Sequence, residues 1–385
     1  MTARSGHDLV DDVAKIAVLR PNAVGDFVFA LPALHALKAA YPKAELVLMG
    51  KAWHRDFLTG RPGPVDRVVE LPPVPGVGVP VDACVAEPAI AAFVNRMRDE
   101  RFDLALQMFG GGRHSNAFLA RLGARLTAGW RAPGAPALER WIAYRAPMPR
   151  RLALLEIAGL AGARPGSLTL PELTLTDADR REAAALLPAL PGERLVLLQP
   201  GSTDPRRCWP TQRFAALGDV LAAMDMRVLV NGSPDEAALV DAVVGQMRHP
   251  ATPLAGRLGL GGLCGLLARA ALVVSNDTGP LHLALALGVP SVGIFWLTNA
   301  LEGMPLRPSL LYLAVASTTR CAVCGQDNLK SRCAHDPSFV DDVSLEQVAA
   351  LARTALAHPH AYPHAYPRAR VLAPGSAHAN AAGGH

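Results

Sequence analysis

The sequence predicts an α/β fold with two doubly wound domains, each a parallel sheet covered by helices on both faces. Apolar runs of strand length alternate with segments of helical period in both halves of the 385-residue chain. The runs LVLL (195–198) and ALVV (271–274) are apolar at consecutive positions, which is typical of strands buried on both faces. A stretch rich in Pro and Gly at 163–193 separates two similar halves. We therefore expect one domain at 1–170 and a second at 171–357, facing each other across a cleft.

Composition limits the class of protein. Half of the residues are hydrophobic and 18% are charged, which excludes a disordered chain and supplies apolar material for two cores. The net charge of +5 is mild for this length, so it allows an anionic substrate or membrane surface without demanding nucleic acid. Six cysteines are too few for a disulfide framework. No apolar segment resembling a signal peptide opens the chain, and we expect a cytoplasmic protein that is at most peripheral at the inner face of the cytoplasmic membrane.

The first half is expected to contain strands that each lead into a helix. Gly25-Asp26 marks the start of the first helix, because a short acidic residue favours a helix N-terminus. The expected strands are 15–20, 45–49, 65–71 and 103–108, and the expected helices are 25–40, 88–100 and 114–122.

The second half repeats the alternation. The expected strands are 194–199, 227–230, 271–275 and 291–295, and the expected helices are 211–224, 234–247, 279–287 and 343–356. The run from Thr278 to Leu301 lacks charged residues and is long enough to span a membrane. Gly288-Val-Pro290 interrupts it, so we expect a buried helix and then a buried strand. Residues 358–385, in which HAYP occurs twice, are expected to form a disordered tail.

Ligands of open parallel sheets bind outside the carboxyl ends of the strands, so the residues just after each strand are the candidates. Asp26 follows the first strand and opens a helix. It could simply complement the helix dipole, or it could be a general base that takes the proton of a hydroxyl nucleophile. The dipole keeps the carboxylate ionised, and such a base suffices when the leaving group is as good as a nucleoside diphosphate.

The loop 200–210 (PGSTDPRRCWP) follows the first strand of the second half. Ser202 and Thr203, next to a glycine, allow backbone N–H groups to approach an oxyanion, and Arg206 and Arg207 supply charge for a diphosphate. A solvated turn with two surface arginines is the alternative.

Two further loops carry polar residues at strand ends. In 231–239 (NGSPDEAAL), Asp235 or Glu236 suits the vicinal hydroxyls of a ribose, although either could only complement a helix dipole. The segment 275–288 (SNDTGPLHLALALG) opens a buried helix whose free N–H groups form an anion site. His282 on that helix is either a satisfied core residue or a ligand contact. The candidate ligand-binding residues here are Asp277, Thr278, Gly279 and His282.

Several activities are disfavoured. No GxGxxG follows a strand and no Walker A sequence occurs, which argues against dinucleotide oxidoreduction and nucleotide hydrolysis. There is no GxSxG nucleophile elbow. The single DxD, Asp177-Ala-Asp179, lies between the halves, and we interpret it as an acid pair at a helix start rather than a metal site.

Four residues within 320–336 could bind a metal: Cys321, Cys324, Cys333 and His335. Thiolates and imidazole at this spacing could form a structural zinc site. A single CxxC with irregularly spaced partners is a weaker signal than two CxxC pairs, and a cluster of reduced thiols in a loop is the alternative.

At these residues the sequence resembles glycosyltransferase family 9, the lipopolysaccharide heptosyltransferases. The matching segments, in the family's order, are LRPNAVGDFVFALPAL, PGSTDPRRCWP, NGSPDEAAL and SNDTGPLHLALALG. The Asp-Thr-Gly-x-x-His of the last is the most specific of them, and the resemblance extends from about Ala14 to about Ala357. It implies the GT-B architecture and an inverting transferase that needs no cofactor for catalysis, with an ADP-heptose donor in the C-terminal half and a glycolipid acceptor in the N-terminal half.

By position, the resemblance implies that Asp26 is the catalytic base and Glu236 binds the donor ribose. Arg207 stands where well-known members have a lysine on the donor phosphates, and this change leaves the donor less certain because the two side chains differ in geometry. The remaining residues implied to contact the donor are Ser202, Thr203, Asp277, Thr278, Gly279 and His282.

Two other functions stay open at this point. One is a family 9 transferase that acts on another glycan or on a protein hydroxyl. The other is a non-catalytic protein that keeps the fold and binds a nucleotide sugar. The sequence names neither the acceptor nor the linkage nor the oligomeric state.

Overall fold

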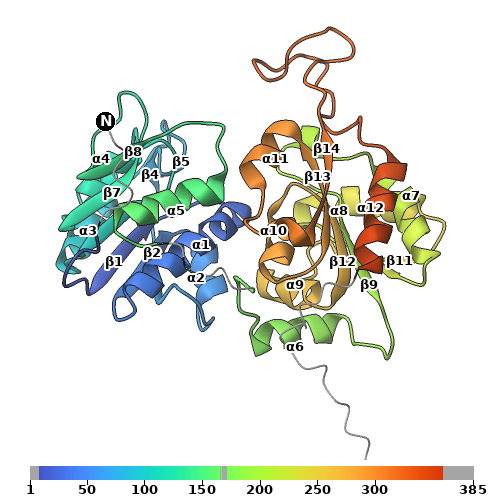
Figure 1. Ribbon diagram of the computed structural model, residues 1–385, viewed down its shortest axis with the longest axis horizontal. Helices are drawn as coiled ribbons and strands as arrows, with labels where there is room; N and C mark the ends of the chain where they lie inside the picture. The colour runs from blue at the N-terminus through green and yellow to red at the C-terminus, as the bar shows by residue number, and fades with distance from the viewer. Residues whose placement is uncertain (1–7, 165, 167–170, 359–385) are drawn as a thin grey trace, which may run out of the picture.

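The computed structural model describes residues 8–164, 166 and 171–358, and they form two parallel sheets side by side (Figure 1). The first sheet has six strands in the order β3-β2-β1-β6-β7-β8, every pair parallel. These strands are β1 (Lys15–Leu19), β2 (Glu45–Gly50), β3 (Arg67–Glu70), β6 (Leu104–Gln107), β7 (Leu126–Arg131) and β8 (Arg140–Ala143). A separate pair consists of β4 (Val74–Pro75) and β5 (Gly78–Val79).

The second sheet repeats the topology in the order β11-β10-β9-β12-β13-β14, again all parallel. Its strands are β9 (Leu195–Gln199), β10 (Arg227–Val230), β11 (Ala251–Pro253), β12 (Ala270–Asn276), β13 (Ser291–Trp296) and β14 (Leu311–Ala316). The strand order reverses beside β1 in one sheet and beside β9 in the other. Ligands of such sheets bind at these switch points, outside the strand ends.

Helices cover both sheets. Those of the first half are α1 (Val24–Ala40), α2 (Ala52–Leu58), α3 (Glu87–Asp99), α4 (Ser115–Ala120) and α5 (Arg150–Leu160). Those that follow are α6 (Asp177–Leu186), α7 (Thr211–Ala222), α8 (Ala237–Gln246), α9 (Leu260–Leu267), α10 (Gly279–Ala286), α11 (Leu297–Gly303) and α12 (Leu345–Ala357). Single 3₁₀ turns are η1 (Pro205–Arg207), η2 (Pro234–Glu236) and η3 (Pro308–Leu310). The predicted α/β class with two doubly wound parallel sheets is confirmed.

Helix α1 joins the two halves. All residues from Phe27 to Leu37 except the exposed His35 are buried, so almost the whole circumference of this part of the helix is covered, as expected of a largely apolar helix. It packs against α5 of its own half and α10 of the other. One hydrophobic cluster therefore runs from β1 and α1 into α9 and α10, and it fixes how the two sheets face each other.

Three sequence predictions can be placed on this fold. The uncharged run after residue 277 forms α10 and then β13, as predicted, and within the described residues no helix has the length and apolar character to cross a membrane. The Asp177-Ala-Asp179 pair opens α6, where Asp179 and Thr176 form a capping box. The predicted boundary between 170 and 171 adjoins a gap in the described residues and stays a prediction; apart from His358, the predicted tail lies outside them.

Candidate active site and metal centre

Helix α1 follows β1, a central strand of the first sheet, and helix α10 follows β12, a central strand of the second sheet. The N-termini of the two helices are in contact. A Cβ atom added to Gly25 would lie 3.2 Å from Cδ2 of His282 and 3.7 Å from Cα of Gly279, and one added to Gly279 would lie 3.2 Å from Cβ of Val24. Only glycine allows this approach without displacing the neighbouring side chains. The contact brings the Asp26 segment of the first half against the Asp277–His282 segment of the second.

Asp26 lies in the first turn of α1 with its side chain 21% exposed. Its Oδ1 accepts hydrogen bonds from Nη1 of Arg150 at 2.8 Å and from Nη2 of Arg20 at 3.3 Å. Among the described residues, neither carboxylate oxygen accepts a backbone N–H, and Oδ2 accepts no hydrogen bond at all. The carboxylate is therefore not a helix cap, and one oxygen is free to accept a proton.

Arg20 is a buried arginine that forms a hydrogen bond to the Asp26 side chain. It directly follows β1, is 3% exposed, and also donates to the backbone carbonyls of Asp26 and Met108. Burial lowers the pKa of Arg20 to about 10, while the charge of Asp26 opposes that shift. Arg20 is still cationic at neutral pH, so a positive charge lies next to the Asp26 carboxylate.

On the α10 side of the contact between α1 and α10, both carboxylate oxygens of Asp277 are hydrogen-bonded. Nε2 of His282 lies 2.9 Å from Oδ1, and Nδ2 of Asn299 donates to Oδ2 at 2.9 Å. His282 is 2% exposed, and burial lowers its pKa although Asp277 opposes the shift. The imidazole is therefore neutral near pH 7 and donates from Nε2. Its Nδ1 is buried without a partner, so in this arrangement His282 orients Asp277 rather than facing open space.

Thr278 and Gly279 stand at the start of α10, with Thr278 in the N-cap position. Thr278 makes no side-chain cap hydrogen bond, and the first N–H groups of a helix have no partner inside it. The N–H groups of Leu281 and His282 point to the Thr278 carbonyl, and Pro280 has no N–H. The backbone N–H groups that could bind an anion beside Asp277 are therefore those of Thr278 and Gly279.

The loop after β9 offers one arginine to a ligand. Arg206 is occupied by a two-point ion pair with Asp204, at 2.9 and 2.6 Å, and lies over the ring of Phe339. Arg207 makes only a 3.9 Å contact with Asp204, and its side chain is 35% exposed. Of the two arginines, Arg207 is therefore the one whose charge is available.

Glu236 connects this loop to the next strand end. Its Oε2 accepts the N–H of Ser233 at 2.8 Å, and the carboxylate lies against the backbone of Gly201. Ser202 beside it has a buried hydroxyl without a partner, whereas Thr203 is exposed. The structure thus brings Glu236 next to Ser202, while Thr203 and Arg207 make no hydrogen bond to another predicted site residue in the described part of the chain.

Asn276, to which sequence reasoning assigned no separate role, links the loop 200–210 to the Asp277 segment. Its Oδ1 accepts the backbone N–H of Trp209 at 3.1 Å, and its Nδ2 donates to the carbonyl of Pro200 at 2.7 Å. It therefore ties both ends of the loop 200–210 to the residue that precedes Asp277. Sequence reasoning also missed Arg20, Asn299, Arg150 and Glu302.

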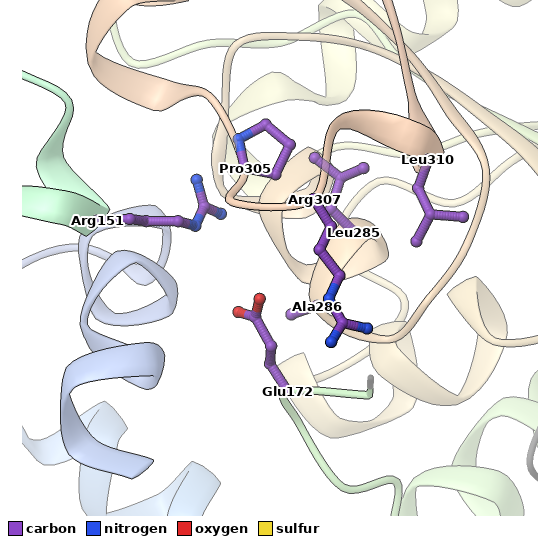
Figure 2. A pocket seen from close by; sticks show the side chains of 7 residues that line it. All are labelled: Arg151, Glu172, Leu285, Ala286, Pro305, Arg307 and Leu310. Carbon is purple, nitrogen blue, oxygen red and sulfur yellow. The ribbon is translucent and has the colours of Figure 1, made fainter. Parts of the chain in front are cut away.

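A small cavity lies behind the site, between α5 and the second half. Arg151 and Glu172 point into it, with Arg307 on its far side (Figure 2). Arg151 is 2% exposed and donates to the backbone carbonyls of Gly303 and Met304 at 2.8 and 3.1 Å. None of the predicted donor-binding residues lines this cavity. The hydrogen bonds of Arg151 beside it connect α5 to the end of α11.

The cysteine–histidine cluster assembles as a possible metal centre. The ligand atoms of Cys321, Cys324, Cys333 and His335 all lie within 4.8 Å of one another. The Cys321 carbonyl accepts the N–H of Gly325 at 2.8 Å, which folds the CxxC into a tight turn. Hydrogen bonds from the backbone N–H groups of Cys324 and Val323 lower the pKa of the Cys321 thiol. Three thiols and an imidazole form a donor set that suits zinc or iron.

Comparison with known proteins identifies the chain. The family model for glycosyltransferase family 9 (heptosyltransferase) matches residues 90–332. The chain belongs to glycosyltransferase family 9. Its activity is therefore that of a glycosyltransferase, and the matched region includes every predicted donor-binding residue. It also includes Cys321 and Cys324 of the metal-ligand cluster, whereas Cys333 and His335 lie just beyond it. Asp26 and the start of α1 lie before it.

Curated relatives are heptosyltransferases. The lipopolysaccharide core heptosyltransferase OpsX of Haemophilus influenzae is 22% identical over 303 residues, which cover 75% of this chain and 81% of the relative. Lipopolysaccharide heptosyltransferase 3 of Escherichia coli is 29% identical over 123 residues, which cover 31% of this chain and 36% of that protein.

Solved structures confirm the GT-B fold. A family 9 glycosyltransferase from Veillonella parvula superposes with a TM-score of 0.72 at 19% identity, covering 92% of this chain and 99% of the other. ADP-heptose lipopolysaccharide heptosyltransferase II of E. coli superposes with a TM-score of 0.69 at 20% identity, covering 89% and 99%. The dodecameric iron-containing heptosyltransferase TibC, solved with ADP-D-β-D-heptose, has a TM-score of 0.52 at 15% identity, covering 92% and 79%.

Proposed function

We propose that this protein transfers a heptose from ADP-heptose, with inversion at the anomeric carbon, to a sugar of the lipopolysaccharide core. The observation that carries the proposal is the contact of the α1 and α10 N-termini. This contact brings the segment of Asp26, whose Oδ2 accepts no hydrogen bond among the described residues, next to Thr278 and Gly279 at the start of α10. It supports a general base on one side and a diphosphate site on the other. The curated relatives, which are lipopolysaccharide heptosyltransferases, support the choice of sugar and acceptor.

The chemistry divides between the two halves. In the first half, Oδ2 of Asp26 accepts the proton of the acceptor hydroxyl as its oxygen attacks the anomeric carbon. In the second half, the N-terminus of α10 and the guanidinium of Arg207 receive the charge that develops on the departing diphosphate. Attack from the side opposite the leaving group inverts the anomeric centre.

Two carboxylates position the donor in this proposal. Glu236, next to Ser202 and the backbone of Gly201, accepts hydrogen bonds from the ribose hydroxyls. Asp277, held by His282 and Asn299, accepts from hydroxyls of the heptose. The acceptor is a glycolipid, which the protein would meet at the inner face of the cytoplasmic membrane.

Arg207→Ala is expected to weaken ADP binding and to lower kcat for transfer, because a cation at the diphosphate matters more as charge builds on the leaving group. Isothermal titration with ADP, together with steady-state transfer rates, measures both effects. Arg206→Ala is the matched control, because that guanidinium is already paired with Asp204. Equal ADP affinity in the wild type and Arg207→Ala would contradict the assignment, and so would full loss of activity in EDTA that Mg²⁺ restores.

The cysteine–histidine cluster is proposed to hold one structural metal ion, with zinc as the first expectation and iron as the alternative. Purified protein should contain about one ion per chain by elemental analysis. Cys321→Ser with Cys324→Ser should lower the melting temperature, because metal binding and local folding are coupled, and leave ADP affinity unchanged. Protein purified anaerobically and without an affinity tag that contains neither metal would show a cluster of reduced thiols instead.

A further inference from the structure

Arg150 connects the candidate base to the opposite half of the molecule. Its Nη1 donates to Oδ1 of Asp26 at 2.8 Å, and its Nη2 donates to Oε2 of Glu302 at 2.8 Å. Asp26 belongs to α1 and Glu302 to α11, so one guanidinium bridges carboxylates from the two halves. The three side chains are 40%, 21% and 23% exposed, and the bridge is therefore partly shielded from water.

The placement of Arg150 in its helix is unfavourable without these partners. It is the first residue of α5, followed by Arg151, and the first turn of α5 has no acidic residue. The positive end of a helix dipole disfavours cations at this position. Burial lowers the pKa of Arg150, but the charges of Asp26 and Glu302 outweigh it and the net shift is upward. The carboxylates of Asp26 and Glu302, which lie on other helices, therefore stabilise a cation at a position that the dipole of α5 disfavours.

Both Arg150 and Arg151 form hydrogen bonds to helix α11. Arg150 binds the Glu302 side chain, and Arg151 donates to the carbonyls at the helix end. At the other end of α11, Asn299 donates to Asp277. This short helix consequently joins the donor-side carboxylate to the acceptor-side carboxylate through one set of contacts.

The bridge acts on one oxygen of the base. Arg150 and Arg20 both donate to Oδ1 of Asp26, and Oδ2 is left for the acceptor hydroxyl. Arg20 is fixed by its burial and by the Met108 carbonyl. Arg150 is the more exposed of the two and is held on its far side by Glu302. The hydrogen bond from Arg150 to Asp26 therefore depends on the contact between α5 and α11.

We propose that Arg150 is a positioning residue for the general base, and that Glu302 makes the placement of Asp26 depend on the contact between the two halves. This inference rests on the proposed role of Asp26. Its consequence is that the base is correctly oriented only while the donor-binding half is seated against α5, which limits proton abstraction to the assembled cleft.

The test compares full-length variants in transfer from ADP-heptose to lipopolysaccharide extracted from a strain that lacks this protein. Arg150→Gln is expected to lower kcat about 10²-fold, because small misplacements of a reacting group have effects of this size. Its KM values for ADP-heptose and for the acceptor should change little, since the variant misplaces the base without altering either proposed binding site.

Glu302→Gln is expected to lower kcat about tenfold while KM for ADP-heptose changes little, because the base is misplaced but the donor site is intact. In the Arg150→Gln background, Glu302→Gln should have no further effect, since both changes break one bridge. Arg150→Lys should restore part of the activity, because an ammonium group keeps the charge but cannot span both carboxylates in the same way.

Glu45→Gln is the matched control. It removes a half-buried carboxylate that pairs with Arg67 at 2.7 Å on β2, and it should leave kcat unchanged. Additive losses in the double variant, or an Arg150→Gln variant with a raised KM for the acceptor and an unchanged kcat, would overturn the inference and make Arg150 an acceptor-binding residue. If Asp26→Asn is active, the proposed function fails first; if it is inactive and Arg150→Gln is not, only the positioning role fails.

Discussion

Asp26→Asn is expected to reduce kcat for transfer by ~10²–10⁴, the range typical for loss of a positioned general base. The amide cannot take the proton of the acceptor hydroxyl. It is nearly the same size as the carboxylate, and its carbonyl oxygen can still accept from Arg150 and Arg20. The measurement is steady-state transfer from ADP-heptose, with calorimetric titration of ADP on the same protein.

ADP affinity should stay within a few-fold of the wild type in Asp26→Asn, because the proposed donor contacts all lie on the second half. The melting temperature should also change little, since the carboxylate caps no backbone N–H. A variant that keeps more than half of its activity would show that Asp26 only complements the dipole of α1. A variant that loses ADP binding would place this residue in the donor site.

Asp179→Ala is expected to lower the free energy of unfolding by about 3–5 kcal/mol, the cost of leaving one member of a buried ion pair alone. Arg61 and Asp179 are 4% and 5% exposed, and the guanidinium donates to both carboxylate oxygens at 2.6 and 2.9 Å. Asp179 also accepts the N–H of Thr176 in the capping box of α6. The pair ties the loop after α2 in the first half to α6, so its loss should also loosen the contact between the halves.

Chemical denaturation of the wild type and Asp179→Ala measures this effect. Glu70→Ala is the control, because its ion pair with Arg55 is about half exposed and such pairs contribute at most about 1 kcal/mol. The double variant Arg61→Met with Asp179→Leu should recover much of the stability, since apolar residues of similar volume can replace a buried pair. A loss below about 1 kcal/mol in Asp179→Ala would mean that water reaches the pair.

The central strands and their helices could be predicted from the sequence because they are buried on both faces. β1, β9 and β12 consist mainly of consecutive apolar residues. The next helices begin at or within one residue of the predicted starts: α7 at Thr211, α10 at Gly279, and α1 at Val24 instead of Gly25. Of the strands at the sheet edges, β3 was predicted, whereas β8, β11 and β14 were missed, as was β7 next to β8. β8 (RWIA) alternates between half-buried and exposed residues, and β7 carries Gly and Arg within its span. Strands toward a sheet edge have a weaker apolar pattern, which is difficult to separate from a loop.

The residues of the candidate site also differ in whether the sequence could reveal them. Asp26 and Asp277 could be found because each lies where a strand that the sequence shows clearly leads into the next helix. Arg150 and Glu302 could not, because the bridge joins residues 124 and 152 positions apart and neither follows a predicted strand. One local signal was present: two consecutive arginines at a helix start, which the helix dipole disfavours. Such a pair indicates partners elsewhere in the fold.

The measurement that tests the central claim most directly is transfer by the purified full-length protein, using ADP-heptose and lipopolysaccharide from a strain that lacks it. Mass spectrometry of the core oligosaccharide should show the addition of one heptose with the wild type and none with Asp26→Asn. Nuclear magnetic resonance of the product should show the anomeric configuration opposite to that of the donor. Binding of ADP without any transfer of heptose by the wild type, or transfer with retained configuration, would contradict the account.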